Sequence, residues 1–383
     1  MATGMAAPAI SAAPKAAYHT SMPALDGSGR LFGAAPIEDA EAISHIGFAF
    51  MGSKVLFAAL ELEVFTTLSS EHGGAPADGL TLEAMAAATS VDERSLTTLT
   101  TALLSMGLLA KDATTLKFTN VPAAEAYLVR GAKYDFGDYL RLQIDKQMYP
   151  FMDNFADALK GKRENQKFET YSEWFSDEKE ARLYTESQHS GSVGPARSLA
   201  RAIPETLEAT HKLLDLGGGS GGFSMTLAQK FPNLNATVLD FPNVCKVGEE
   251  FAAVSEPFVG DRVKFLGGNA LETEYPKDQD MVLMSYISGS ISGDDVKKMY
   301  KGAFEALKPG GTVVVHDFMV EDTRDGPPLA ALWACQHLVF TPGAVSLTPG
   351  YVSEELAAAG FESCETATMI PGLTMGVFGK KPL

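Results

Sequence analysis

The second half of the chain alternates short apolar runs with helical stretches, and glycine-rich breaks separate them. This alternation is typical of a parallel sheet with helices on both faces. The end of the chain differs, because residues 361–370 and 373–379 form two strand-like runs around a Pro-Gly turn, which predicts an antiparallel ending. We therefore predict an α/β domain over 205–383 with a doubly wound, mostly parallel sheet of seven strands, the first five at 213–216, 236–240, 263–266, 281–286 and 312–316.

In the first half, apolar residues recur at helical spacing from residue 37 to about residue 107. Two short strand-like pieces follow at 108–110 and 116–119, so the plan of residues 37–133 is that of a winged helix. Winged helices often bind DNA, but the stretch expected to read DNA carries Asp92 and Glu93 beside Arg94 alone. Without charge to neutralise phosphates, DNA binding is disfavoured, and we expect a helical domain that packs in a homodimer.

Residues 134–204 predict a mostly helical linker that is rich in polar and aromatic side chains. Substrate pockets commonly lie between domains and are lined by aromatic residues with a few polar groups. The alternative is that these side chains simply pack the two domains together. The candidates of this segment include Tyr139, Arg141, Gln143, Tyr149, Tyr171, Trp174, Tyr184, Gln188 and His189.

Composition narrows the class of partner. The net charge of −17 argues against nucleic acid or an anionic membrane as the partner, so a small-molecule partner is expected. We predict that no apolar run is long enough to span a bilayer. The three cysteines lack metal-ligand spacing, and no metal site is predicted. Residues 1–36 are rich in Ala, Pro, Ser and Gly and predict a disordered tail. We expect a cytoplasmic protein, or a chloroplast or mitochondrial one if this tail is a targeting segment.

A glycine-rich turn carries the clearest chemistry. The apolar run at 213–216 contains Asp215 and leads into Gly217, Gly218 and Gly219, a strand that turns sharply into a helix and lets the backbone approach a ligand. The same glycines would suit a dinucleotide, but Asp215 could face the ammonium of S-adenosylmethionine, and Asp240 closes the next strand where a carboxylate would take ribose hydroxyls. The alternative is that this is a glycine-rich turn of an ordinary α/β domain without a ligand, in which Asp215 serves only as a cap.

Several further motifs make the chain resemble the class I S-adenosylmethionine-dependent methyltransferases, specifically the two-domain small-molecule O-methyltransferases with a winged-helix dimerisation domain and a Rossmann-like catalytic domain. The resemblance implies that Gly217 and Gly219 approach the methionine part of the cofactor and that Asp240 binds the ribose. It also implies that Phe241 packs on the adenine. Around this cofactor it places Asn269, Ala270 and Ser285 as well. The matching stretches are 215–219, 238–242, 267–271, 306–311 and 356–361.

The chain departs from this family where a general base is expected. In the phenol-methylating members a histidine follows the fourth strand and two acids position it; here these positions hold Gly289, Asp317 and Ser346. A phenol must lose a proton as it attacks the methyl group, whereas a thioether sulfur has no proton to lose. The missing base favours S-methylation, or a substrate that deprotonates unaided.

Within the family, the segments 139–143 and 188–189 resemble the methylthiohydroxybutyrate S-methyltransferases of dimethylsulfoniopropionate synthesis. Their substrate is a carboxylate, and Arg141 falls where family members contact substrate, so its guanidinium could bind the carboxylate. We expect Gln143, Tyr149, His189 and His337 to help position this substrate, and Tyr139, Gln188, Tyr286 and Trp333 to complete its pocket.

Each of these roles has an alternative. Arg141 could instead pair with Asp145 one turn on, and His189 and His337 could be core histidines. His316 could be a relocated base.

Three functions are therefore weighed. The leading one is S-methylation of 4-methylthio-2-hydroxybutyrate by in-line transfer without a base. The second is O- or C-methylation of an aromatic, phenolic or tetrapyrrole-like molecule, with Tyr286 or His316 as proton acceptor. The third is a binding protein that keeps the cofactor fold without catalysis.

Overall fold

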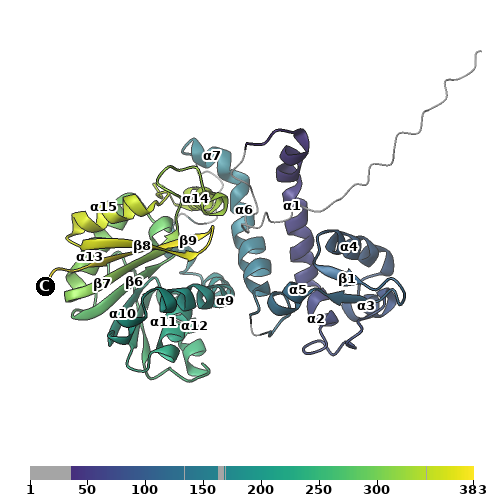
Figure 1. Cartoon of the computed structure of the whole chain (residues 1–383), viewed down its shortest axis with the longest axis horizontal. Coiled ribbons are helices and arrows are strands. Elements are labelled where there is room, and N and C mark those ends of the chain that lie inside the picture. The colour runs from purple at the N-terminus through teal and green to yellow at the C-terminus, as the bar shows by residue number, and fades with distance from the viewer. Residues whose placement is uncertain (1–35, 133, 163–167, 169, 342) are drawn as a thin grey trace, which may run out of the picture.

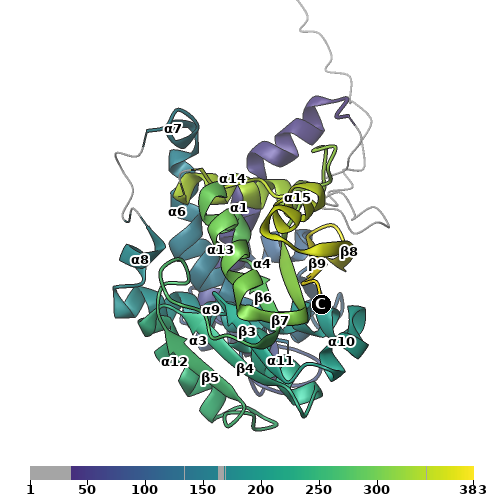
Figure 2. The same ribbon diagram turned by 90° about the vertical axis from the view of Figure 1, so that its left-hand side faces the viewer.

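The computed structural model describes residues 36–383 apart from 133, 163–167, 169 and 342. The tail predicted for residues 1–36 therefore lies almost wholly outside the described residues. Figure 1 shows an N-terminal domain on one side, a sheet-containing domain on the other, and helices of the linker between them, and Figure 2 views the same chain with the sheet-containing domain toward the viewer.

The N-terminal domain has the predicted order of helices followed by a hairpin. Asp92 caps α4 by accepting a hydrogen bond from the Ser95 amide at 3.0 Å, and Thr81 caps α3 in the same way. The hairpin strands pair antiparallel, with Ala110 opposite Thr119. The elements are α1 (Ala40–Glu61), α2 (Val64–Leu68), α3 (Leu82–Thr89), α4 (Glu93–Ser105), β1 (Leu109–Lys111), β2 (Phe118–Asn120) and α5 (Pro122–Tyr127).

Helix α1 contradicts one expectation. By length and composition alone it could cross a membrane, although the sequence was expected to contain no such run. Its buried residues are only Phe57, Ala59 and Leu60, so most of its apolar surface is exposed in the single chain.

The linker is helical, as predicted, but its first long helix is a π-helix, a form that is frequent at functional sites. This helix packs against both α1 and α9 and so joins the two domains. The linker elements are η1 (Tyr139–Met148, the π-helix), α6 (Tyr149–Phe151), η2 (Met152–Asn154), α7 (Phe155–Leu159), α8 (Tyr171–Trp174), α9 (Glu178–Ala202) and α10 (Pro204–Glu208).

The C-terminal domain contains the predicted seven-stranded sheet, in the order β5-β4-β3-β6-β7-β9-β8. The first five of these strands are parallel, and β9 and β8 add the antiparallel ending. The strands are β3 (Lys212–Leu216), β4 (Asn235–Asp240), β5 (Val263–Gly267), β6 (Gln279–Ser285), β7 (Leu307–Phe318), β8 (Glu362–Ile370) and β9 (Thr374–Lys380). The helices are α11 (Gly222–Lys230), α12 (Pro242–Ala253), η3 (Ser288–Ser290), α13 (Gly293–Ala306), α14 (Pro328–Phe340) and α15 (Pro349–Ala359).

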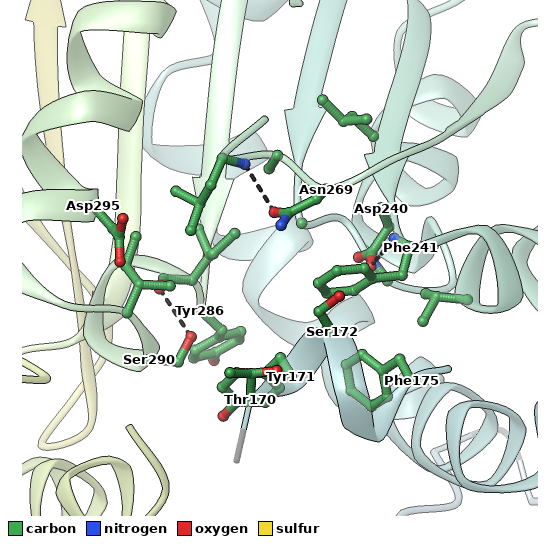
Figure 3. Close-up of a pocket in the computed structure, with 18 of the residues that line it drawn as sticks. Thr170, Tyr171, Ser172, Phe175, Asp240, Phe241, Asn269, Tyr286, Ser290 and Asp295 are labelled. Atoms are coloured by element: carbon green, nitrogen blue, oxygen red, sulfur yellow. Dashed lines mark hydrogen bonds between the residues drawn. The ribbon is translucent and has the colours of Figure 1, made fainter. Parts of the chain in front are cut away.

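The strand order reverses between β3 and β6, and such a switch point opens a crevice at the carboxyl ends of the strands. The glycine turn follows β3, and Ser285 ends β6, so both lie at this crevice. Figure 3 shows Asp240, Phe241, Asn269 and Tyr286 gathered there.

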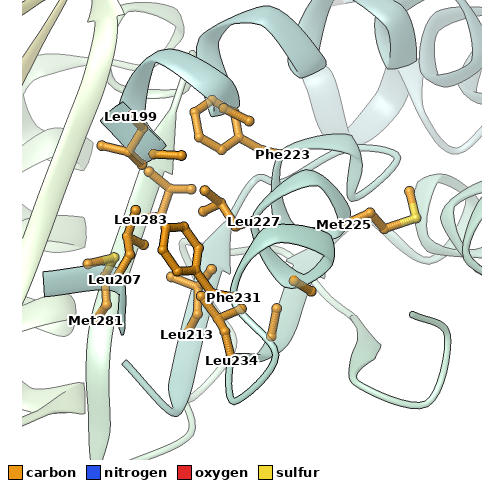
Figure 4. Packing of buried hydrophobic residues seen from close by; sticks show 14 of the residues in the cluster. Leu199, Leu207, Leu213, Phe223, Met225, Leu227, Phe231, Leu234, Met281 and Leu283 are labelled. Atoms are coloured by element: carbon orange, nitrogen blue, oxygen red, sulfur yellow. The ribbon is translucent and has the colours of Figure 1, made fainter. Parts of the chain in front are cut away.

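Alternate residues of the central strands enter two different cores. Leu213, Met281 and Leu283 pack with Phe223 and Leu227 on the face covered by α9 and α11 (Figure 4). The intervening residues, such as Leu214 and Val282, pack on the opposite face with α13 and α15. Burial on both faces explains why these strands are almost continuously apolar in the sequence.

Candidate active site

The glycine turn after β3 is built for close approach. Gly217, Gly219 and Gly221 all have φ between 58° and 72°, a region that favours glycine. A Cβ on Gly217 would lie 2.5 Å from Ile287 Cδ1, whereas a Cβ on Gly219 would meet nothing within 4 Å. Ile287 therefore packs closely against the turn at Gly217, whereas the space beside Gly219 is open and could admit a ligand.

Asp215 is buried next to this turn, and only one of its two carboxylate oxygens has a hydrogen-bond partner among the described residues. One oxygen accepts a hydrogen bond from the Ser224 hydroxyl at 2.6 Å, and the other has no partner among the described residues. Burial raises the pKa of Asp215 to about 7. The residue lines a small cavity of about 30 Å³ together with Gly218 and Ser285. An unpaired buried carboxylate oxygen is suited to a cationic group of a ligand.

Asp240 ties the second strand to the turn. Its oxygens accept the amide hydrogens of Gly219 at 2.8 Å and Phe241 at 2.7 Å, and burial raises its pKa to about 6. Because each carboxylate oxygen can accept more than one hydrogen bond, Asp240 retains acceptor capacity toward the cavity that it lines.

A cavity of about 550 Å³ extends from this turn between the sheet and the linker (Figure 3). It adjoins the small cavity, since both are lined by Gly217, Gly219, Ser285 and Tyr286. The structure thus brings together every residue predicted for the cofactor. The large cavity holds Gly217, Gly219, Asp240, Phe241, Asn269, Ala270 and Ser285, and the small one adds Asp215 and Gly218.

Of the predicted substrate residues, Gln188 and Tyr286 line the large cavity. Tyr171 and Tyr184 also line it, although the sequence indicated them only as part of an aromatic linker. Burial raises the pKa of both phenols, so these hydroxyls stay protonated. The aromatic richness of the linker was the signal that could have singled them out.

Tyr139 is close to this group without being among the residues that line the large cavity. Its ring stacks on Phe136 at 4.8 Å, and its phenol is near enough to raise the pKa of Tyr184 and Tyr286 electrostatically. Burial also raises the pKa of Tyr139 itself. Its predicted contact with substrate stays a prediction.

The remaining predicted residues of the linker start lie apart from the large cavity. Arg141 pairs with Asp138 at 2.7 Å, so the alternative pairing with Asp145 was wrong. Asp145 contacts Lys54 instead, and Lys54 also lies 4.2 Å from the centre of the Tyr149 ring. The role of Arg141 as a carboxylate partner stays a prediction, to be judged by mutation.

Gln143 is fully buried in η1, and neither end of its amide has a hydrogen-bond partner among the described residues. It is not among the residues that line the large cavity. The structure therefore gives no contact by which it would position a substrate.

His189 packs against neighbouring side chains in this structure, and its role in positioning a substrate stays a prediction. Its ring stacks on Phe251 at 3.9 Å, and its Nδ1 lies 2.9 Å from the Ser220 hydroxyl, whereas His189 is not among the residues that line the large cavity. Burial lowers its pKa to about 4.

His316 does not fit the part of a relocated base. Its side chain is fully buried on β7, and its two ring nitrogens lie 2.8 Å from Ser285 Oγ and 2.9 Å from Thr374 Oγ1. Burial lowers its pKa to about 3, and it is not among the residues that line the cavity. A ring with both nitrogens engaged cannot take a proton directly from a bound substrate.

His337 occupies the space that a side chain at position 289 would need. A Cβ on Gly289 would lie 3.1 Å from His337 Nδ1 and 3.3 Å from an Asp317 oxygen. Asp317 accepts hydrogen bonds from the amides of Gly289 and Phe318, and Trp333 stacks on Phe318 at 4.6 Å. Burial lowers the pKa of His337 to about 4 and raises that of Asp317 to about 7. His337 and Trp333 thus pack beside this position rather than among the residues lining the cavity.

Two family domains cover most of the chain. The O-methyltransferase domain matches residues 151–362, and the O-methyltransferase dimerisation domain matches residues 44–130. The tetracenomycin polyketide synthesis 8-O-methyl transferase of Streptomyces glaucescens is 28% identical over 89% of this chain and 96% of its own length. Acetylserotonin O-methyltransferase of Macaca mulatta is 26% identical over 82% of this chain and 89% of its own.

Solved structures agree on the fold. The crystal structure of human N-acetylserotonin methyltransferase in complex with SAM superposes with a TM-score of 0.80 at 21% identity, covering 92% of this chain and all 100% of that one. The structure described as PigF with SAH gives a TM-score of 0.75 at 17% identity, with 90% and 100% coverage. The chain belongs to the O-methyltransferase family, and its methyltransferase domain follows the dimerisation domain of that family.

Proposed function

We propose that this methyltransferase takes its methyl group from S-adenosylmethionine, bound along the glycine turn. The unpaired oxygen of Asp215 suits the cofactor's ammonium, and the remaining acceptor capacity of Asp240 suits the ribose hydroxyls. Phe241 and Asn269 stand in the same cavity for the adenine ring and its amine. Bound there, the cofactor supplies a methyl group on a sulfonium, and the residues of the chain hold the acceptor in line with it.

For the acceptor we propose the thioether sulfur of 4-methylthio-2-hydroxybutyrate. The observation that carries this proposal is the lack of a base at position 289, together with the engagement of both His316 nitrogens. In this reaction a sulfur lone pair attacks the methyl carbon as the cofactor's carbon–sulfur bond breaks. The products are S-adenosylhomocysteine and 4-dimethylsulfonio-2-hydroxybutyrate, and no proton has to move.

The charge of the cavity is compatible with this transfer. Positive charge passes from one sulfur to another, and among the described lining residues there is no Lys or Arg to repel it. The aromatic residues Tyr171, Phe241 and Tyr286 line the same cavity, and aromatic rings attract cations that approach their faces. Pockets for one ligand commonly measure about 300–1,000 Å³, so a cavity of about 550 Å³ that must hold cofactor and acceptor favours a small acceptor.

The test is a methyl-transfer assay with S-adenosylmethionine that compares 4-methylthio-2-hydroxybutyrate with methionine, methylthiopropionate and a catechol, read by product mass. We expect turnover of the hydroxy acid, with a kcat that stays nearly constant between about pH 7 and 9 because no base titrates. Turnover of the catechol alone would contradict the proposal.

O-methylation of an aromatic hydroxyl is the second candidate. The relatives that are O-methyltransferases by name, including a 3-hydroxy-5-methyl-1-naphthoate 3-O-methyltransferase of Streptomyces sahachiroi, favour it. So does the 3.1 Å between His337 Nδ1 and a Cβ built at 289, which brings an imidazole to the position where the family carries its base. If this candidate holds, His337→Gln abolishes catechol methylation. If S-methylation holds, the same variant keeps its turnover of the thioether.

A further inference from the structure

The residues that line both the small and the large cavity mark the place where the two cavities meet. They come from α9, from the glycine turn and from the end of β6 with the residue that follows it. The aromatic residues among them are Tyr184 and Tyr286, which stand on different elements. The described residues of this set are Tyr184, Gln188, Gly217, Gly219, Ser285 and Tyr286.

The groups suited to the cofactor are divided between the two cavities. Asp215, whose free oxygen suits the ammonium, lines the small cavity. Asp240, Phe241 and Asn269, which suit the ribose and the adenine, line the large one. In S-adenosylmethionine the sulfonium joins the amino-acid part to the adenosine part. A cofactor bound in this way therefore carries its sulfonium where the cavities meet, beside the residues that line both.

The ring of Tyr184 is held in place by other aromatic rings. Its centroid lies 4.8 Å from that of Phe175 and 5.3 Å from that of Trp174. Trp174 is 1% exposed, so this support belongs to the protein interior. Burial raises the pKa of the Tyr184 phenol well above its ordinary value, so the side chain is neutral at physiological pH.

Tyr286 is held equally firmly on the sheet. Its amide donates a hydrogen bond to the carbonyl oxygen of His316 at 2.9 Å, and its φ is 59°. Its ring centroid lies 4.6 Å from that of His316 and 4.8 Å from that of Phe318. A non-glycine residue in this backbone region is costly and is frequent at functional sites. Two rings with fixed positions thus contribute to the lining where the cavities meet.

The charged side chains around these rings are acidic. Among the described residues that line either cavity, the charged ones are Asp215, Asp240, Glu272 and Asp295, and none is Lys or Arg. Aromatic rings attract cations, most strongly where water is excluded. The surroundings of the junction therefore favour a positively charged ligand over a neutral ligand of the same shape.

We propose that Tyr184 and Tyr286 flank the cofactor's sulfonium and make the site select positive charge at the point of methyl transfer. This inference rests on the proposed binding of S-adenosylmethionine along the glycine turn and does not depend on the acceptor. The selection favours the loaded cofactor over S-adenosylhomocysteine, whose sulfur is neutral, and so favours release of the spent cofactor. With a thioether acceptor, the positive charge stays near the same rings after transfer.

Calorimetry with the full chain at pH 8 tests this selection without turnover. The ligands are S-adenosylmethionine, S-adenosylhomocysteine and sinefungin, in which a carbon bearing an ammonium replaces the methylated sulfur. We expect the wild type to bind the two cationic nucleosides about fivefold or more tighter than S-adenosylhomocysteine, because a cation beside aromatic rings is stabilised.

Substitutions separate the rings from the rest of the site. Tyr184→Leu and Tyr286→Leu should each lower the preference for S-adenosylmethionine over S-adenosylhomocysteine about threefold, whereas Tyr184→Phe and Tyr286→Phe keep the rings and the preference. Binding of S-adenosylhomocysteine should stay near that of the wild type, which also reports that each variant is folded. Tyr127→Leu, at an exposed tyrosine outside the lining of both cavities, is the matched control.

The outcomes distinguish this inference from the cofactor site itself. Equal affinities of the wild type for all three nucleosides would overturn the selection by charge while leaving the cofactor site intact. Leu variants that keep the preference, or Phe variants that lose it as far as the Leu variants do, would overturn the role of the rings. A Leu variant that does not bind S-adenosylhomocysteine is replaced by Met, which fills irregular gaps without a ring. If the wild type binds none of the nucleosides, the proposed cofactor site fails together with the inference.

Discussion

At the scale of single residues, Asp215 combines complete burial with an oxygen that has no partner. Desolvation is the main cause of its raised pKa, about 7, and the nearby charge of Asp240 adds to it. A cation placed at the free oxygen would favour the ionised form and lower this pKa. Cofactor binding and proton release from Asp215 should therefore be linked.

This linkage predicts a pH-dependent cofactor affinity. Between pH 8 and pH 6 the affinity of the wild type for S-adenosylmethionine should fall, by up to about tenfold per pH unit below the pKa, because Asp215 must first lose its proton. Asp215→Asn should bind more weakly and lose most of this slope. Titration calorimetry at several pH values measures both, with the exposed Asp78→Asn as control; an affinity of the wild type that is independent of pH would contradict the linkage.

The same group predicts a pH-dependent stability of the free protein. A carboxyl whose pKa is raised on folding binds its proton more tightly in the folded state, so stability falls as pH rises from about 4 to about 7 and then levels off. The loss is on the order of 4 kcal/mol for a rise from the ordinary carboxyl pKa to about 7. Denaturant unfolding at pH 5 and pH 8 should reveal a smaller difference in Asp215→Asn than in the wild type, and equal differences would refute the assignment.

At the scale of elements, α14 packs on η3 and on β7. This packing limits the size of the side chain that position 289 can accommodate. His337 comes from α14, Gly289 from η3 and Asp317 from β7, and they meet within a few ångströms. A Cβ at position 289 would make tight contacts with His337 and Asp317, so a side chain there requires these neighbours to shift. The imidazole of His337 thus lies beside position 289 and limits the size of a side chain there.

This packing predicts a destabilising effect of the smallest side chain at position 289. Gly289→Ala should lower the free energy of unfolding by about 1–3 kcal/mol, because its methyl group would crowd His337 and Asp317. In a His337→Ala background the same substitution should cost much less, because the imidazole no longer occupies the space. Urea unfolding of the four proteins measures this, and equal costs in both backgrounds would rule out the proposed collision.

At the scale of the whole molecule, α1 exposes apolar side chains that the single chain leaves uncovered, among them Ile43, Ile46 and Phe50. These three follow one another at helical spacing on one stripe. Most of α1, from residue 44, falls in the segment that matches the O-methyltransferase dimerisation domain. A second copy of the chain is the partner that this match supports, and covering such a stripe would remove apolar surface from water.

We therefore predict a homodimer that depends on α1. The double variant Ile46→Asp, Phe50→Asp should be monomeric in light scattering after gel filtration, because charges would be buried without partners. Val254→Asp, at an apolar position of the methyltransferase domain that is still more exposed, is the control and should stay dimeric. A variant of α1 that remains dimeric would place the interface elsewhere.

Much of the catalytic domain could be predicted because its signals are local. The glycine turn after β3 and Asp240 at the end of β4 occupy fixed places in a parallel sheet, so the residues around the cofactor follow from strand order alone. The winged-helix arrangement could be predicted for the same reason, because N-cap residues and the spacing of apolar residues are short-range signals that mark helices.

The tertiary structure alone decided which polar side chains share a site. Helix η1 packs against α1 and α9, and this packing determines the partners of its side chains. Arg141 pairs with Asp138, and Asp145 contacts Lys54, a residue 91 positions away. The bond from His316 to Thr374 likewise spans 58 positions. The sequence by itself determined the fold and the cofactor turn, because both depend on short-range pattern. The surroundings of the acceptor depend on contacts between distant elements, and no local pattern encodes them.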